Sequence, residues 1–392
     1  MINRQLEDYP HLQFRRCWEL TFEGWHLVGQ CEAYVKAISE SPILPHDHAE
    51  LLRVSLIKGA IATTAIEGNT LSEDDLDQIL KQQKHMPPSR AYQETEATNV
   101  ISALNDLLDL VLNQDGSVII KSDLILDLHK RIGRDLGETF DAIPGRFRTD
   151  SRVVGPYRAP DYRLVPGLMK QLCDWLYEEF HYDRGQTFAD VIIQAIVAHV
   201  YLEWIHPFGD GNGRTGRLLE FYILLRGGNP NIASHILSNH YNETRPEYYR
   251  QLNSARQNQS LTEFIEYALL GFRDGLVQTL EVVQRSQFRI AWDRYVYDAF
   301  ERRKMKNRNV FKRRRKQILA LPLNQPIHID MIPTLSIEIA REYSGMSPRT
   351  IQRDVDELEV LDLIERGTDR NMIRAKAQQL MSSGHLPKHR VM

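Results

Sequence analysis

Residues 206 to 217 read His-Pro-Phe-Gly-Asp-Gly-Asn-Gly-Arg-Thr-Gly-Arg, and this stretch decides how the rest of the chain is interpreted. It follows an apolar helix predicted over residues 188–204, and its proline and glycines predict a tight loop that leads into a second apolar helix. Three backbone N–H groups would then line the start of the second helix, where free donors and the helix dipole favour an anion such as phosphate. They belong to Gly211, Asn212 and Gly213.

The charged side chains of this loop have complementary chemical uses. Arg214 and Arg217 are three residues apart on one helix face, so both planar guanidinium groups can hold phosphate oxygens. Asp210 offers the hard oxygen ligand that Mg²⁺ prefers, and His206 can accept a proton from an incoming hydroxyl. A lone histidine would more often be a hydrogen-bonded core residue beside a simple turn, but the assembled motif between two helices favours the functional interpretation.

The string matches, position by position, the signature H-x-F-x-D/E-G-N-G-R-x-x-R, so this segment resembles the Fic family. Proteins of that family transfer AMP from ATP to a protein hydroxyl, and the resemblance therefore implies ATP as substrate, Mg²⁺ and a protein target. It implies that His206 is the general base, Asp210 the magnesium ligand and Phe208 the anchor of the loop. The implied phosphate binders are Gly211, Asn212, Gly213, Arg214 and Arg217.

Residues 63 to 68, Thr-Thr-Ala-Ile-Glu-Gly, resemble the inhibitory segment S/T-x-x-x-E-G/N of the same family. The resemblance implies that Glu67 pairs with Arg217 and tilts bound ATP out of its attack geometry, and Thr64 is taken as a nucleotide contact. From the residues alone, the segment is also a helix end capped by Gly68, and both interpretations can hold together. Some members of the family also remove AMP, and the sequence does not decide whether Glu67 serves that reaction.

A single β-hairpin is predicted over residues 145–166, with one strand at 152–154, a turn at Gly155 and a returning strand at 162–165. It resembles the flap with which the family adds a strand to its target segment and aligns the target hydroxyl. The docking residues assigned to this flap are Arg152, Val153, Val154 and Gly155.

An aromatic stretch after the motif supplies a further candidate nucleotide contact, Tyr241. The neighbouring run from Arg245 to Tyr248 and Tyr249 is similar to an R-x-x-Y-Y run near the adenine site of the family. Two adjacent tyrosines cannot share one helical face, so we expect at most one of them to touch the base and the other to pack in the core.

Composition narrows the function classes. Hydrophobic residues make up 42% and charged residues 26%, and 49 Lys and Arg against 52 Asp and Glu give a formal charge of −3, which excludes a uniformly basic nucleic-acid coat protein. Cys17, Cys31 and Cys173 are too few and too scattered for a disulfide framework or a zinc site. The sequence shows no signal-like N-terminus and no uncharged apolar stretch of about 18 residues, so a cytoplasmic location without a membrane partner is expected.

Periodicity predicts a mainly α protein with three parts. The parts are an N-terminal helical region with the inhibitory motif at 1–88, a catalytic domain at 89–290 and a winged-helix-like domain at 291–392. Ser72 and Asp75 resemble a capping box that opens a helix running to residue 83, and paired prolines within 85–89 break the helical pattern.

The C-terminal domain is predicted from a helix at 336–343, a tight turn, a helix at 349–361 and a two-stranded wing at 364–373. The second helix would expose Arg349, Thr350, Gln352 and Arg353. Ten Lys or Arg and no acid lie upstream at 302–316, either as a solvated face or as a site for phosphate backbones or an acidic partner. Such modules also serve in dimerisation or target docking.

These patterns together predict a protein adenylyltransferase inhibited by Glu67, able to modify itself and, by resemblance, able to form a homodimer. Two rivals stay open. The same fold could use another nucleotide donor, or the chain could be a DNA-binding regulator whose catalytic core is secondary.

Overall fold

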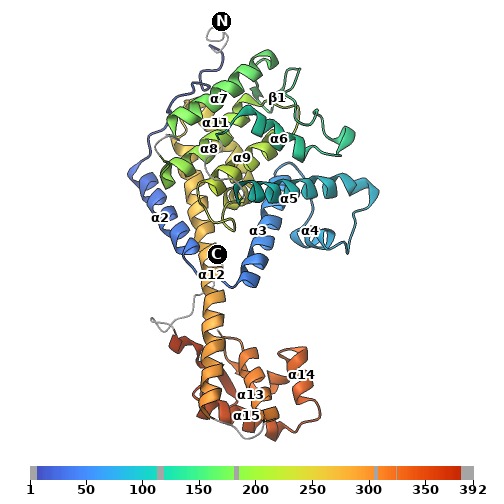
Figure 1. Cartoon of the computed structure of the whole chain (residues 1–392), viewed down its shortest axis with the longest axis vertical. Helices are drawn as coiled ribbons and strands as arrows, with labels where there is room; N and C mark the ends of the chain where they lie inside the picture. The colour runs from blue at the N-terminus through green and yellow to red at the C-terminus, as the bar shows by residue number, and fades with distance from the viewer. Residues whose placement is uncertain (1–6, 113–118, 181–184, 304–307, 324, 381–392) are drawn as a thin grey trace. The chain divides into compact units, whose positions relative to one another are not determined.

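The computed structural model describes residues 7–112, 119–180, 185–303, 308–323 and 325–380. The chain divides into two compact units, Met1–Leu280 and Glu281–Met392 (Figure 1). The predicted parts 1–88 and 89–280 fall together within the first unit. Helices dominate both units, which confirms the predicted mainly α class.

The first unit is built from helices and one short hairpin (Figure 1). Its α-helices are α2 (Phe22–Ser39), α3 (Pro45–Ala65), α4 (Glu73–Leu80), α5 (Ala91–Leu112), α6 (Ser122–Ile132), α7 (Val165–Glu179), α8 (Phe188–Ile205), α9 (Asn212–Arg226), α10 (Ile236–Glu243), α11 (Arg245–Asn258) and α12 (Thr262–Arg303), the last of which continues into the second unit.

The centre of this unit is the pair α8 and α9, joined by the loop at 206–211. α8 begins at a capping box formed by Thr187 and Asp190, and nearly all of its side chains are buried. It is long and apolar enough to cross a membrane, but 78% of it is buried inside the unit, as expected for a core helix. The predicted helix over 188–204 is confirmed, with one more residue at its C-terminal end.

Helices α3 and α5 bring the predicted inhibitory turn to the start of α9, since each packs against α9 and against the other. α3 ends at Ala65, and Gly68 has a φ of +101°, so the helix end and the glycine cap both occur. The capping box of Ser72 and Asp75 is present. α4 runs from Glu73 to Leu80 and so ends three residues before the predicted end.

The hairpin forms, but its returning strand differs from the prediction. β1 (Val153–Val154) pairs with β2 (Tyr157–Arg158) across a two-residue turn that begins at Gly155. The residues predicted to return, Tyr162–Leu164, form a 3₁₀ turn that leads into α7 instead. The Asp161 carboxylate accepts the N–H of Arg163 and starts this turn, so the local side-chain cap competes successfully with strand formation.

The second unit packs three helices on a small sheet. Besides the end of α12, its elements are α13 (Arg308–Ala320), β3 (Ile327–His328), η5 (Ile329–Thr334), α14 (Ile337–Tyr343), α15 (Pro348–Val360), β4 (Ile364–Arg366), β5 (Met372–Ala375) and η6 (Lys376–Leu380). The strands are antiparallel in the order β3-β5-β4. Helix, turn, helix and wing therefore occur where the sequence predicts them, and β3 is an additional strand that the sequence analysis missed.

Candidate functional site

The loop at 206–211 is held in an unusual backbone conformation. His206 ends α8 with φ 49° and ψ 62°, a left-handed conformation that a side chain disfavours, and Gly211 opens α9 with a φ of 79°. The Asn212 side chain closes the loop, since its amide donates to the Phe208 carbonyl at 3.0 Å and accepts the Phe208 N–H at 2.9 Å. The side chain of Asn212 therefore clamps the loop, and its contribution to anion binding would come from its backbone N–H.

The loop is anchored from below by Phe208 and His129. Phe208 is fully buried, and its ring lies flat on the His129 imidazole with 3.7 Å between ring centroids. His129 Nδ1 accepts the N–H of Gly145, so Nε2 carries the proton and donates to the Asp210 carbonyl at 3.0 Å. Burial lowers the pKa of His129 to about 4, which keeps this neutral tautomer in place near pH 7.

His206 is positioned as a neutral imidazole. Burial, with Arg148 nearby, lowers the pKa of His206 to about 4. The Arg148 guanidinium donates to the His206 carbonyl at 2.7 Å and to the carbonyls of Asp150 and Pro160, and in this way ties the end of α8 to the hairpin. A histidine that is uncharged across the physiological range is available to accept a proton.

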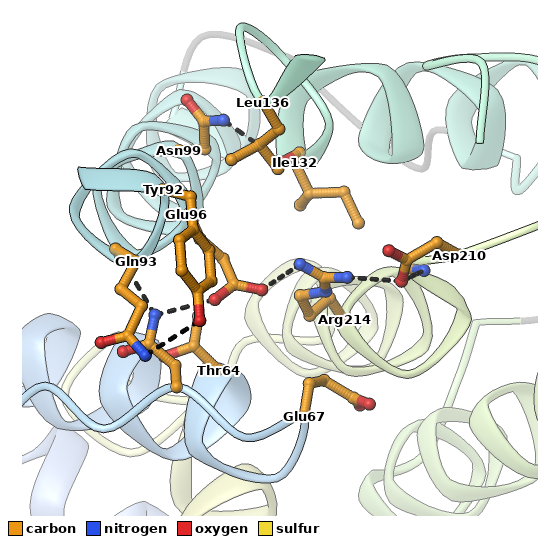
Figure 2. Close-up of polar contacts among 12 residues, drawn as sticks. Thr64, Glu67, Tyr92, Gln93, Glu96, Asn99, Ile132, Leu136, Asp210 and Arg214 are labelled. Carbon is orange, nitrogen blue, oxygen red and sulfur yellow. Dashed lines mark hydrogen bonds and ion pairs between the residues drawn. The ribbon is translucent and has the colours of Figure 1, made fainter. Parts of the chain in front are cut away.

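Arg214 lies between two carboxylates, as Figure 2 shows. One terminal nitrogen pairs with Glu96 of α5 and the other with Asp210 Oδ1 at 2.7 Å. The same Asp210 oxygen accepts the N–H of Gly211. Arg214 and Glu96 are almost completely buried, whereas Asp210 is partly exposed. The planar guanidinium is therefore fixed in orientation at the start of α9.

Glu96 also joins this arginine to the turn that follows α3. The Asn69 side-chain amide donates to Glu96 Oε2 at 2.7 Å and to the Gln93 carbonyl at 3.0 Å, and its oxygen accepts the N–H of Leu71. Asn69 stands two residues after Glu67. The residue that positions Arg214 and the inhibitory turn thus share one buried hydrogen-bond network.

Glu67 reaches the second arginine of α9. The Arg217 guanidinium donates to Glu67 Oε1 at 2.6 Å and to the Thr63 carbonyl at 2.9 Å. Burial alone would raise the pKa of Glu67, but the adjacent Arg217 lowers it below the ordinary value, so the carboxylate is charged. A Cβ at Gly213 would lie 2.3 Å from Glu67 Oε1, so glycine is required there while Glu67 covers the start of α9.

Comparison with known families agrees with this geometry. The model of the Fic/DOC family matches residues 119–224, which contain the loop, α8 and most of α9. The chain carries a Fic domain. The match includes every residue of the motif from His206 to Arg217.

Curated relatives of the Fic domain are named protein adenylyltransferases. The chain is 34% identical over 205 residues to protein adenylyltransferase fic-1 of Caenorhabditis elegans, which covers 52% of this chain and 37% of the relative. It is 28% identical to protein adenylyltransferase Fic of Nematostella vectensis, over 52% of this chain and 44% of the relative. The chain thus spans well under half the length of these two curated relatives.

Solved structures share the fold. A crystal structure of a Fic family protein from Desulfovibrio desulfuricans matches with a TM-score of 0.56 at 21% identity, and covers 92% of this chain and 98% of that one. A fragment of Fic-1 from C. elegans matches with a TM-score of 0.52 at 25% identity, over 67% and 73% of the two chains.

Two predicted nucleotide contacts of the Fic domain have structural roles instead. The Thr64 side chain is buried, and its hydroxyl donates to the Ala60 carbonyl at 2.9 Å. Tyr241 is fully buried, and its hydroxyl donates to Glu220 at 2.9 Å. Both expectations are corrected, because spacing relative to a motif does not reveal which face of a helix turns inward.

The run from Arg245 to Tyr249 contacts the inhibitory turn. The Tyr249 hydroxyl donates to the Ile66 carbonyl at 3.4 Å, and Arg245 donates to the Ala65 carbonyl at 3.5 Å. Tyr248 is buried, with its hydroxyl 2.9 Å from His199 Nε2. As expected for adjacent tyrosines, one packs in the core and the other faces out.

The flap residues of the Fic domain lie on an exposed edge. Val153 and Val154 are 62% and 41% exposed, which is unusual for valine and leaves the short strand β1 accessible. Arg152 is held at the base of the hairpin by ion pairs to Asp141 at 2.5 Å and Asp150 at 3.0 Å.

Sequence reasoning missed four residues that support the site: Asn69, Glu96, His129 and Arg148. Glu96 and His129 carried a usable signal, because each is a polar residue on the apolar face of an amphipathic helix, where a buried partner is required. Arg148 and Asn69 lie in irregular segments that show no such pattern.

Proposed function

We propose that this protein is an adenylyltransferase that transfers AMP from ATP to a hydroxyl side chain of a protein. The observation that carries the proposal is the joint placement of a neutral His206, the partly exposed Asp210 and two buried arginines around the start of α9. The adenylyltransferase names of the relatives support it, since they share the matched half of the chain.

The proposed reaction requires a base and a phosphate cradle. His206 accepts the proton of the target hydroxyl as its oxygen forms a bond to the α-phosphorus, and the bond from that phosphorus to the bridging oxygen breaks to release pyrophosphate. The first N–H groups of α9 and the fixed guanidinium of Arg214 balance the charge on the phosphates. Each of these groups is ordered before substrate arrives, which favours catalysis by placement.

The donor set at Asp210 fits Mg²⁺. Its carboxylate is a hard ligand and is partly exposed, and one of its oxygens is already engaged by Arg214 and Gly211. The described residues hold no group of three or more His, Cys, Asp or Glu side chains that could hold a metal ion by themselves. This suits an ion carried in with nucleotide phosphates, and such an ion would supply further charge neutralisation.

Glu67 is proposed as the brake on this reaction. It occupies Arg217, the guanidinium that the family resemblance assigns to the γ-phosphate, and it covers the start of α9 beside Gly213. ATP bound while this contact persists has one phosphate partner fewer. The exposed strand β1 is proposed to align the target segment by strand addition.

The identity of the transferred group tests the proposal. The full chain is incubated with Mg²⁺ and a lysate, once with ATP labelled at the α-phosphate and once at the γ-phosphate. We expect protein-bound label from the α position only, and its loss in His206→Ala by a factor of at least about a hundred, because base catalysis contributes at least that much.

A matched control isolates the role of the histidine. His46→Ala changes an exposed histidine at the start of α3 and should leave labelling unchanged. Nucleotide binding to His206→Ala should also persist, since His206 does not belong to the phosphate cradle. Full activity in His206→Ala, or label from the γ position, would contradict the proposed reaction.

A different donor remains the rival within the same fold, because the site recognises phosphates through features that all nucleotides share. The mass added to the labelled target separates AMP from any other transferred group. The predicted homodimer, the cytoplasmic location and the idle-core regulator stay predictions.

A further inference from the structure

Charge is divided unequally between the two units. Residues 1–280 contain 27 Lys and Arg and 38 Asp and Glu, a formal charge of −11, whereas residues 281–392 contain 22 and 14, a formal charge of +8. The near-neutral charge of the whole chain therefore conceals a basic C-terminal unit. A positively charged unit attracts polyanions through its summed field.

The basic run at 302–316 is largely consumed inside this unit. Arg313 and Arg314 both pair with the buried carboxylate of Asp354 on α15, at 2.7 Å each. Lys316 pairs with two glutamates of α14. The Arg315 guanidinium lies 4.2 Å from the centre of the Tyr297 ring. These members fix α13 to its neighbours, so they are neither a solvated face nor a phosphate-binding patch.

The acidic residues of α15 are neutralised by the same kind of contact. All four pair with arginines from other elements of the unit: Asp354 with Arg313 and Arg314, Asp356 and Glu359 with Arg366 of β4, and Glu357 with Arg303 and Arg314. The negative charge of α15 is thereby offset on the side where the helix meets its own unit.

The arginines of α15 behave differently. Arg349 and Arg353 are exposed, stand one turn apart on one face of the N-terminal half of the helix, and have no ion pair or side-chain hydrogen bond within the described part of the chain. Arg341 on α14 and Arg370 in the β4–β5 turn are likewise exposed and without a side-chain partner among the described residues. The unit thus spends its other cations on packing and leaves these four to solvent.

This pattern coincides with the contact positions of a winged helix-turn-helix. In that arrangement the N-terminal residues of the second helix meet base edges in the major groove, and flanking elements meet the phosphate backbone. α14 and α15 are the two helices, and β4 and β5 with Arg370 between them form the wing. We propose that the C-terminal unit binds duplex DNA, with α15 in the major groove and Arg349 and Arg353 as its contacts.

The geometry favours a duplex over an acidic protein. An α-helix with its side chains is about 10 to 12 Å wide, which matches a major groove about 12 Å wide. Two arginine forks on one face at the entering end of the helix suit phosphate oxygens and guanine edges.

The test uses the full chain and a fluorescein-labelled 30-base-pair duplex of mixed sequence, with binding followed by anisotropy between 50 and 200 mM NaCl. We expect binding that weakens steeply with salt. Arg349→Ala combined with Arg353→Ala should weaken it at least tenfold and should reduce the slope of log K against log salt by up to about 1.8, since each phosphate contact contributes about 0.9. Thermal unfolding should be unchanged, because neither side chain has a partner to lose.

A control with the same loss of charge separates contact from net charge. Arg294 and Arg302 are exposed on the part of α12 that belongs to this unit, and their double alanine variant should keep the slope and lose less than threefold in affinity. The proposal is overturned if wild type does not bind the duplex at 50 mM NaCl, if the two double variants weaken equally, or if poly-L-glutamate at equal charge displaces the duplex.

Discussion

Two glutamates from outside the motif hold the two arginines of α9, and they do so in different ways. Glu96 comes from the middle of α5, and both it and Arg214 are buried, with side chains 10% and 5% exposed. Glu67 comes from a turn after α3, and it is 33% exposed although Arg217 is 1% exposed. One contact is sealed on both sides, and the other is open on the side of the glutamate.

The remaining bonds of the two carboxylates widen this difference. Glu96 also accepts from Asn69, so it is held at both oxygens, whereas Arg217 is the residue that donates to Glu67 among the hydrogen bonds of the described side chains. A carboxylate on an open turn with one charged partner can leave without unmaking a helix. The comparison teaches that the Glu96 pair positions an arginine permanently and that the Glu67 pair can be released.

The largest expected effect is the release of Glu67. Glu67→Gly removes a partly desolvated charge-assisted pair worth about 1.5 to 3 kcal/mol, so AMP transfer should rise about ten- to a hundredfold. The rate of label transfer from α-labelled ATP measures it. Glu40→Gly, at the exposed C-cap of α2, is the matched control and should not change the rate. An unchanged rate in Glu67→Gly would remove the brake from the comparison.

The opposite change is expected at Glu96. Glu96→Gln keeps the size of the side chain and its contact with Asn69 but loses the charge that orients Arg214, so transfer should fall about tenfold. The unfolding midpoint should change little, because Asp210 still pairs with Arg214 and the buried carboxylate no longer has to be desolvated. A combined variant with Glu67→Gly sharpens the comparison, because a released brake should not restore a misplaced Arg214.

The sequence carried one of these two contacts and not the other. Glu67 stands in a segment with a recognisable pattern beside a motif, so its partner Arg217 could be named. Glu96 lies 118 residues before Arg214 in the chain, and periodicity gives the buried face of α5 but not the arginine that meets it. The loop, α8, α9 and the capping box of α4 followed from local chemistry, which a single segment contains.

The errors have a similar cause. The return of the hairpin was placed too late because Asp161 caps a turn locally, and local side-chain bonds compete with strand pairing. Thr64 and Tyr241 were assigned to the nucleotide because a resemblance supplies positions along the chain and not the direction of a side chain. The basic run at 302–316 reads as a charged surface, but its partners Asp354, Glu338 and Glu342 come from helices that only the fold brings near.

The smallest expected effect separates the two glutamates by the sign of their pH dependence. Arg217 holds the pKa of Glu67 below 4.5 against the effect of burial, so its stabilising contribution is present above pH 4.5 and is lost as the pH falls through the folded pKa. Burial raises the pKa of Glu96 above 4.5 although Arg214 opposes it, so its contribution is present below pH 4.5 and is lost as the pH rises through the folded pKa.

Urea unfolding of wild type, Glu67→Gln and Glu96→Gln between pH 3.5 and 7.5 measures these signs. The free energy of unfolding of wild type minus that of Glu67→Gln should rise with pH in the acid range, and the difference from Glu96→Gln should fall as the pH passes above 4.5. The buried histidines titrate in all three proteins and cancel in both differences. Two slopes of the same sign would mean that both contacts are of one kind, and Glu96 could not then be distinguished from a second brake.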